Sequence, residues 1–159
     1  MLYTPADDEK QLLAAIDIAA RSRAHGNHPF GALLVLGGEI VLEAENTVVT
    51  GQDATGHAET NLVRLACRTY RREQLPESTL YTSTEPCAMC AGAVYWSGIG
   101  RVVYALGEDE LLAVTGANPD NPTMSLPCRE VFARGQRPTS VSGPSLHAPA
   151  AAVHDGFWN

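Results

Sequence analysis

Four residues in the sequence have the types and the spacing to carry chemistry: His57, Glu59, Cys87 and Cys90. The two cysteines stand three positions apart directly after Pro86, and His57 precedes the first of them by thirty positions. A catalytic zinc ion typically takes three protein ligands and leaves its fourth tetrahedral position to water. One imidazole and two thiolates supply such a set, so we predict one zinc ion per chain, held by His57, Cys87 and Cys90.

Glu59 stands two positions after His57, close enough to lie beside the metal without binding it. A carboxylate in that place can accept a proton from an activated water molecule and deliver it to a substrate atom. Hydrolytic removal of an amino group from an aromatic ring needs such a proton carrier. We therefore predict that Glu59 is the catalytic residue of a zinc-dependent aminohydrolase.

Other interpretations of the same residues stay open at this point. A Cys-x-x-Cys pair can be a redox dithiol, although a redox role explains neither Pro86 nor the spacing of His57 and Glu59. A non-catalytic zinc-stabilised interaction module would need a fourth protein ligand. The remaining candidates do not stand at close ligand spacing to the three residues; they are Cys67, Cys128, His25, His28, His147 and His154.

The elements that must position these residues follow from hydrophobic periodicity and from turn residues. Their predicted order is helix, two strands, helix, strand, helix, strand and helix. The predicted ranges are 8–23, 31–36, 39–45, 57–70, 79–83, 86–96, 101–105 and 108–113. Such alternation predicts an α/β fold, a three-layer α/β/α sandwich around one sheet.

Two of the predicted helices begin at the candidate ligands. The second helix starts at or beside His57, and Pro86 occupies a favoured first-turn position that places Cys87 and Cys90 in the first turn of the third. Free backbone N–H groups and the positive end of the helix dipole stabilise thiolates there. We therefore expect both helices to direct their amino ends at the same ion.

The chain has 159 residues, 45% of them hydrophobic, and we predict a single domain over 1–159. Turn-forming residues follow position 115, before a short helix expected over 128–134. The tail 138–159 contains the helix-breaking or turn-forming residues Gly143, Pro144 and Pro149, and it has Phe157-Trp158 near its end.

Charge argues against a nucleic-acid partner. Eleven basic and eighteen acidic residues give a formal net charge of -7, and the one lysine is Lys10. An arginine group in 64–72 is flanked by acids and is best interpreted as a solvated helix surface. The first ten residues resemble no signal peptide, and no run is long enough to span a membrane. We expect a cytoplasmic protein, with Cys67 and Cys128 as small buried side chains.

The pattern H-x-E followed by P-C-x-x-C resembles the signature of the cytidine deaminase-like superfamily. The chain is most similar to the bacterial guanine deaminase branch, over roughly residues 8–115. It is also similar to bacterial tRNA adenosine deaminases, in which Val is expected in place of Phe30 and the C-terminal helix is basic. The segments that carry the resemblance are Pro29–Ala32, Glu45–Val48, His57–Glu59, Tyr81–Cys90 and Gly92–Trp96.

The resemblance implies a five-stranded mixed sheet, a homodimer and a purine-sized pocket. It implies that Asn46 hydrogen-bonds the base, that the backbone of Ala58 meets a ring substituent, and that Phe30 and Trp96 form apolar walls. Each side chain also has a structural interpretation. Asn46 suits a turn, and Phe30 and Trp96 suit core packing.

The resemblance also implies an acidic residue in the loop after the fourth strand, and a tail that closes the site. The loop here has Asn118 at about the expected place, and Asp120 is the nearest acid. In the tail 138–159, Phe157 and Trp158 offer an aromatic lid, over this chain's pocket or, by exchange, over the partner's.

The predicted function is zinc-dependent release of ammonia from a small nucleobase-like substrate with water. A guanine-type purine is the first choice, and isoguanine, cytosine analogues and amino-triazines remain open. The alternatives are a tRNA adenosine-to-inosine deaminase and a non-catalytic zinc-stabilised module.

Overall fold

A computed structural model describes residues 3–159; residues 1 and 2 lie outside the described part of the chain. Its centre is one five-stranded mixed sheet in the order β2-β1-β3-β4-β5. Strand β1 pairs antiparallel with β2 and β3, whereas β3 with β4 and β4 with β5 are parallel. The strands are β1 (Gly31–Leu36), β2 (Glu39–Glu45), β3 (Thr79–Thr84), β4 (Arg101–Leu106) and β5 (Ser140–Ser142).

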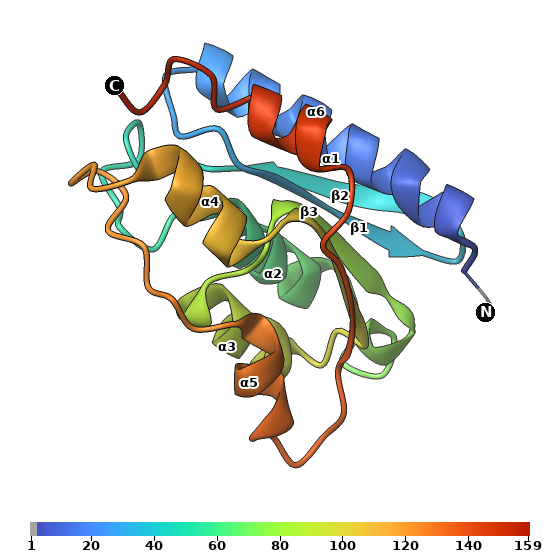
Figure 1. The fold of residues 1–159 in the computed structure, drawn as a ribbon. Helices are drawn as coiled ribbons and strands as arrows, with labels where there is room; N and C mark the ends of the chain where they lie inside the picture. The colour runs from blue at the N-terminus through green and yellow to red at the C-terminus, as the bar shows by residue number, and fades with distance from the viewer. Residues whose placement is uncertain (1–2) are drawn as a thin grey trace.

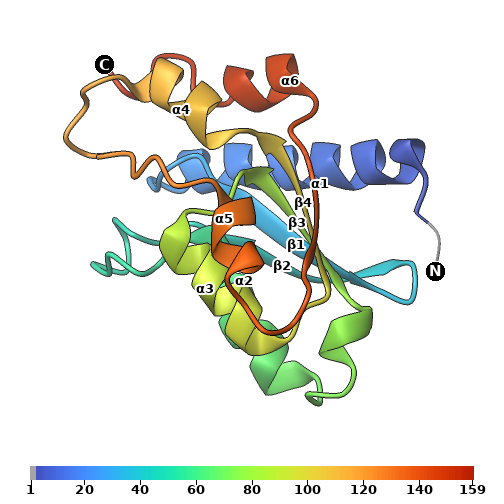
Figure 2. The ribbon, with the colours of Figure 1, turned by 60° about the horizontal axis from the view of Figure 1, so that its bottom comes forward.

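Helices cover both faces of this sheet, as Figures 1 and 2 show. The long helix α1 and the short helix α6 lie side by side on one face, and α2, α3 and α5 lie on the other. The helices are α1 (Pro5–Ala24), α2 (Ala58–Thr69), α3 (Ala88–Ser97), α4 (Glu108–Thr115), α5 (Cys128–Ala133) and α6 (His147–Ala152), with a 3-10 turn η1 (Leu75–Glu77). The predicted three-layer α/β/α sandwich is confirmed.

Two apolar cores follow from the alternation of side chains along the strands. Leu34, Leu80 and Val102 point toward α2 and α3, whereas their neighbours Leu33 and Val103 point toward α1. Strands β1 and β4 bury both faces and are almost continuously hydrophobic, as expected for the interior of a three-layer fold, whereas the edge strands β2 and β5 are partly exposed.

The opening helix begins earlier than its apolar periodicity predicts. Thr4 caps α1, because its side chain accepts a hydrogen bond from the Asp7 backbone N–H while the Asp7 carboxylate accepts one from the Thr4 N–H. Pro5 then occupies the first turn. The helix therefore starts at Pro5, three residues before the predicted start at position 8.

The hairpin between β1 and β2 agrees with its prediction. Gly37 and Gly38 form the two-residue turn, and both have positive φ angles, 63° and 83°. Such angles at both positions are what the tight hairpin turn requires. Near this turn, the register of β1 against β2 shifts between Leu34 and Val35.

The C-terminal segment contains two elements that periodicity does not predict. Strand β5 adds to the sheet edge beside β4, with Ser140 opposite Arg101, and α6 packs on α1 and β4. Arg23 of α1 donates hydrogen bonds to the carbonyls of Val153 and Asp155, which hold the end of the chain against the same helix. In one chain, the tail therefore packs over its own sheet.

No helix within residues 3–159 combines the length and the apolar character needed to cross a lipid bilayer.

Candidate metal centre and cavity

The candidate ligands lie at the amino ends of two packed helices. His57 is the residue that caps α2, and Cys87 caps α3; both have extended backbone angles, which let the chain turn into each helix. Pro86 therefore precedes the helix instead of lying within its first turn. Helices α2 and α3 pack against each other, so their amino ends converge.

Three ligand atoms come together there. His57 Nδ1 lies 3.6 Å from Cys87 Sγ and 3.5 Å from Cys90 Sγ. All three atoms lie within 4.8 Å of one another, so each can reach a common central ion. One ring nitrogen and two thiol sulfurs are donors that suit zinc. Within residues 3–159 this group contains no fourth side chain, as expected for a site that keeps one position open.

The sulfur atoms are prepared for deprotonation. A hydrogen bond from Cys90, with another from His57, lowers the pKa of Cys87 to about 4. The neighbouring Cys87 sulfur and burial raise the pKa of Cys90 well above its usual range, so the first thiolate forms at Cys87. The same contact with Cys87 raises the pKa of His57. Binding of a divalent ion displaces the remaining protons.

Glu59 lies in the first turn of α2, beside this cluster, and is only 5% exposed. Its Oε1 atom lies 2.9 Å from the Thr82 hydroxyl of β3, which orients the carboxyl group. Burial raises the pKa of Glu59, so the group can hold a proton closer to neutral pH than an exposed glutamate can. A raised pKa suits a residue that accepts and returns protons.

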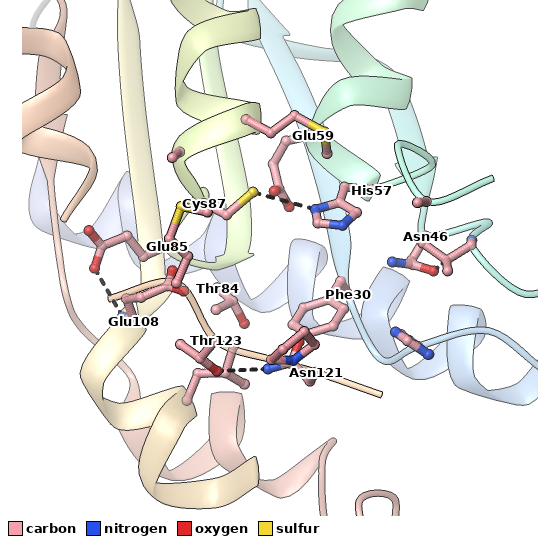
Figure 3. Close-up of a pocket in the computed structure, with 18 of the residues that line it drawn as sticks. Phe30, Asn46, His57, Glu59, Thr84, Glu85, Cys87, Glu108, Asn121 and Thr123 are labelled. Atoms are coloured by element: carbon pink, nitrogen blue, oxygen red, sulfur yellow. Dashed lines mark hydrogen bonds between the residues drawn. The ribbon is translucent and has the colours of Figure 1, made fainter. Parts of the chain in front are cut away.

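A cavity of about 400 Å³ opens from this cluster. Figure 3 shows His57, Glu59 and Cys87 along one wall, Asn46 on one flank, and Glu85 and Glu108 on the opposite flank. Phe30, Asn121 and Thr123 lie across from the metal wall. Among the cavity residues that the structure describes, none is Lys or Arg.

The predicted base-binding residues separate into three groups. Asn46, Phe30 and Asp120 line the cavity. The Asn46 side-chain oxygen accepts a hydrogen bond of 3.0 Å from the Val48 N–H, so its amide NH₂ is the part left for a ligand. Asn46 therefore both holds the local turn, through the Val48 N–H, and lines the cavity. Ala58 is buried at the start of α2, between His57 and Glu59.

A second group lies one layer behind the cavity wall. Trp158 packs its ring at 5.1 Å from the His28 ring and 6.2 Å from the Phe30 ring, and Phe157 lies 5.7 Å from His28. The Asn118 side chain donates a hydrogen bond to the Trp158 carbonyl. In this chain, the predicted lid therefore supports two wall residues from outside and does not itself line the cavity.

Trp96 requires a correction. Its side chain is 84% exposed on the surface of α3 and does not line the cavity, so it forms no wall of the pocket in this chain. The physical reason is position: Cys87 and Cys90 occupy the start of α3, and Trp96 lies at the other end, about two turns away from Met89, which does reach the cavity.

Sequence reasoning missed several cavity residues, among them His28, Thr84, Glu85 and Glu108. Glu85 Oε1 accepts a hydrogen bond of 3.0 Å from the Glu108 N–H, and Oε2 accepts one of 2.8 Å from the Cys128 N–H. One buried carboxylate thus caps both α4 and α5. Burial and the nearby Cys87 and Glu85 raise the pKa of Glu108 to about 8.

One signal in the sequence was available for two of these residues. Glu85 follows the end of β3 directly, and Glu108 follows the end of β4 with one residue, Gly107, between them. The carboxyl ends of adjacent parallel strands meet at one edge of a sheet, which is where α/β proteins bind ligands.

Comparison with known protein families gives one match over residues 5–106, to the model described as the cytidine and deoxycytidylate deaminase zinc-binding region. This range includes His57, Glu59, Cys87 and Cys90 and excludes the C-terminal segment.

Among curated proteins, the chain is similar to a probable cytosine deaminase of Schizosaccharomyces pombe. The two are 39% identical over 153 residues, which are 96% of this chain and 93% of the relative. The guanine deaminase of Bacillus subtilis is 48% identical over 77 residues, which are 48% of this chain and 49% of that protein.

Solved structures give the same fold. The guanine deaminase from Nitrosomonas europaea superposes with a TM-score of 0.72 at 26% identity, over 97% of this chain and 84% of that one. A structure from a study of tRNA:A34 deaminases has a TM-score of 0.70 at 25% identity, over 91% of this chain and 99% of that one.

Proposed function

The chain belongs to the cytidine and deoxycytidylate deaminase family of zinc-binding proteins, and from this membership we propose that it removes an amino group hydrolytically from a free nucleobase. The observation that carries the proposal is the union of three features in one place. A three-ligand cluster, a buried acid beside it and a cavity of about 400 Å³ meet at the amino ends of α2 and α3.

His57, Cys87 and Cys90 would hold the zinc ion. When bound, the ion acts as a Lewis acid that makes a water molecule nucleophilic near neutral pH. Glu59 accepts a proton from that water and delivers it to the ring nitrogen next to the reacting carbon. A second proton passes through Glu59 to the amino group, the carbon–nitrogen bond breaks, and ammonia leaves. Overall, one water molecule replaces an amino group with an oxo group.

Asn46 supports a substrate that bears a carbonyl group. Its side-chain oxygen already accepts the Val48 N–H, whereas within residues 3–159 its NH₂ group donates no hydrogen bond and can donate to a ligand. Phe30 offers a ring against which a flat heterocycle can pack. A ring with an amino group for the metal wall and an oxo group for Asn46 describes guanine, isoguanine and cytosine.

Guanine-type purines are our first choice among these rings, with isoguanine, cytosine analogues and amino-triazines as the alternatives. The solved guanine deaminase from Nitrosomonas europaea supports the first choice. The probable cytosine deaminase of Schizosaccharomyces pombe, which matches nearly the whole chain, supports cytosine.

A tRNA adenosine deaminase is the second candidate, because the solved tRNA:A34 deaminase superposes over most of the chain. Charge is the observation against it. The formal net charge is -7, and the described cavity is lined by acids but by no Lys or Arg, where a phosphate chain would have to pass. Tight, salt-sensitive binding of tRNA in a filter assay would reverse this ranking.

We further propose a homodimer in the cytoplasm. Met89 and Trp96 are exposed seven residues apart on α3, and therefore on one face of that helix. An apolar helix face of this kind favours a second copy of the chain. Four free cysteines, two of them metal ligands, suit a reducing compartment. Light scattering after gel filtration would contradict the dimer if it gave the mass of one chain.

The deciding experiment is an ammonia-release screen with zinc-loaded protein across purine, pyrimidine and triazine bases. We expect release from at least one free base, and none from the Cys90→Ser variant, which lacks one ligand. Zinc at one ion per chain without ammonia from any base would support the non-catalytic module and overturn the proposal.

A further inference from the structure

Glu108 lies at the carboxyl end of β4 and is the first residue of α4, where it lines the cavity and is 8% exposed. Within residues 3–159 its carboxylate forms no hydrogen bond and no ion pair, although its backbone N–H is bound. Neither carboxylate oxygen is fully enclosed by protein, so the group opens onto the cavity, where a ligand can complete its hydrogen bonds. Glu108 therefore has an unused polar group directed at the space where the substrate binds (Figure 3).

The position of Glu108 is fixed by Glu85. The Glu85 carboxylate binds the first backbone N–H of α4 and the first of α5, and the Glu85 N–H donates to the Leu106 carbonyl at the end of β4. Because Glu85 also directly precedes Pro86-Cys87, the same residue joins the metal loop to the flank that carries Glu108. The flank is held relative to the metal and is not a free loop.

Thr84 supplies a second, independent observation on the same flank. It lines the cavity, is 3% exposed, and its hydroxyl has no hydrogen-bond partner in the described chain. The residues around the cavity thus include a second polar group, the Thr84 hydroxyl, that has no partner in the described chain.

We propose that Glu108 determines substrate specificity by accepting a hydrogen bond from the far ring of a two-ring base, so that the enzyme selects purines over pyrimidines. The inference rests on the proposed deaminase function. Asn46 and Glu108 lie on opposite flanks of the metal wall, so a bound ring presents one edge to each of them (Figure 3).

The chemistry of the two edges separates the candidate rings. When the amino-bearing carbon of guanine meets the metal wall, the carbonyl lies toward one flank, and the other flank receives a ring nitrogen and the N–H of the five-membered ring. Isoguanine likewise places five-membered-ring nitrogen on that side. Cytosine in the matching orientation presents its carbonyl to Asn46 but only two C–H groups to Glu108. A buried polar group left unpaired in this way disfavours the wrong substrate.

The test compares kcat/KM for guanine and cytosine in the zinc-loaded wild-type protein, Glu108→Leu and Glu108→Gln. Glu108→Leu removes the acceptor and should lower kcat/KM for guanine by about 10²-fold or more while cytosine is unchanged or improved. Glu108→Gln keeps one acceptor oxygen, so its kcat/KM for guanine should lie between the values of the wild-type protein and of Glu108→Leu. The matched control is Asp109→Asn, the exposed acid next to it on α4, which should change neither substrate more than about twofold.

Equal losses for both bases in Glu108→Leu, with zinc content retained, would overturn the inference. So would a wild-type protein that deaminates cytosine and not guanine. If the wild-type protein releases ammonia from no base in the screen, the proposed function fails. Calorimetric binding of guanine and cytosine to the zinc-loaded protein then decides the role of Glu108, since a loss of affinity confined to guanine supports it and equal affinities contradict it.

Discussion

Acidic side chains have opposite surroundings at the two ends of the parallel strands β3 and β4. Near the amino end of β4, Arg101 binds both carboxylate oxygens of Asp8 at 2.8 and 2.6 Å, and the Tyr81 hydroxyl donates a third hydrogen bond at 2.7 Å. Although burial opposes the shift, these bonds lower the pKa of Asp8. At this end of the sheet, the negative charge of Asp8 is therefore paired and hydrogen-bonded.

At the carboxyl end, three buried acids face the cavity: Glu59, Glu85 and Glu108. Within residues 3–159 none of them forms an ion pair with an Arg or Lys side chain. Burial raises the pKa of Glu59 and of Glu108 instead of lowering it. The contrast indicates that one end of the sheet stabilises the fold, whereas the other keeps two acids without a cation, Glu59 and Glu108, available for protons and for a ligand.

The largest expected effect is at the cavity end. Glu59→Gln should lower kcat by about 10³-fold, because the amide keeps the size of the side chain and its hydrogen bond with Thr82 but cannot carry a proton. Zinc content should be unchanged and thermal stability not reduced, since the substitution removes a buried carboxylate. Steady-state ammonia release, metal analysis and calorimetry measure the three quantities.

The control for this variant is Glu130→Gln, an exposed acid on α5, which should keep full activity. A Glu59→Gln protein that retains turnover within tenfold of the wild-type rate would eliminate Glu59 as the proton carrier. A variant that loses its zinc would instead make Glu59 part of the metal site.

The opposite end should respond in the opposite way. Arg101→Leu leaves the partly buried Asp8 carboxylate without its cation, and we expect the free energy of unfolding to fall by about 2 to 3 kcal/mol, between the values for exposed and for fully buried pairs. Turnover per folded chain should stay within about twofold, because this pair lies away from the cavity. Urea unfolding and activity below the transition measure both.

Arg21→Leu is the matched control, since Arg21 pairs with Glu43 in an ion pair whose side chains are about half exposed. The control should cost less than about 1 kcal/mol. Equal losses in the two variants would remove the distinction between a stabilising end and a functional end of the sheet.

Periodicity predicted most of the fold because most elements have strong local signals. The Gly37-Gly38 turn and the apolar runs of β1 and β4 leave few alternatives. Strand β5 and α6 lack such signals: β5 is three residues with two serines, and α6 contains Pro149. Their structure depends on tertiary partners, such as the edge of β4, which a local pattern cannot contain.

The site divides in the same way. His57, Glu59, Cys87 and Cys90 were predictable because metal chemistry restricts residue type and spacing. Glu85 and Glu108 were not singled out, because an isolated acid after a strand is ordinary until the two strand ends are known to be adjacent. Trp96 was misplaced because the sequence does not show how far along α3 the cavity extends, and Trp96 lies about two turns beyond Met89.

Lowering the pH should also distinguish the two ends of the sheet, with a smaller effect on stability, through the protonation of His154. This imidazole is buried behind the cavity wall, where Trp158 Nε1 donates a hydrogen bond of 3.0 Å to its Nδ1 atom. Burial, with the nearby Arg23, lowers the pKa of His154 from 6.5 to about 4. The folded state therefore binds fewer protons than the unfolded state between these values. The stability that His154 contributes is complete above pH 6.5 and is lost as the pH falls toward 4.

The Asp8 contribution follows a different window: its lowered pKa keeps that stability until the pH falls below its usual value of 3.8. Between pH 6.5 and 4, the segment behind the cavity should thus weaken while the Asp8 end holds. The shift of His154 corresponds to at most about 3 kcal/mol. Urea unfolding of the zinc-free wild-type protein and of His154→Phe, each at pH 7 and pH 4.5, measures this contribution. All other groups titrate alike in the two proteins, so the difference between their free energies of unfolding isolates His154. A stability difference between the two proteins that is the same at both pH values would show that the imidazole is not held neutral, and the distinction between the two ends would then rest on the acids alone.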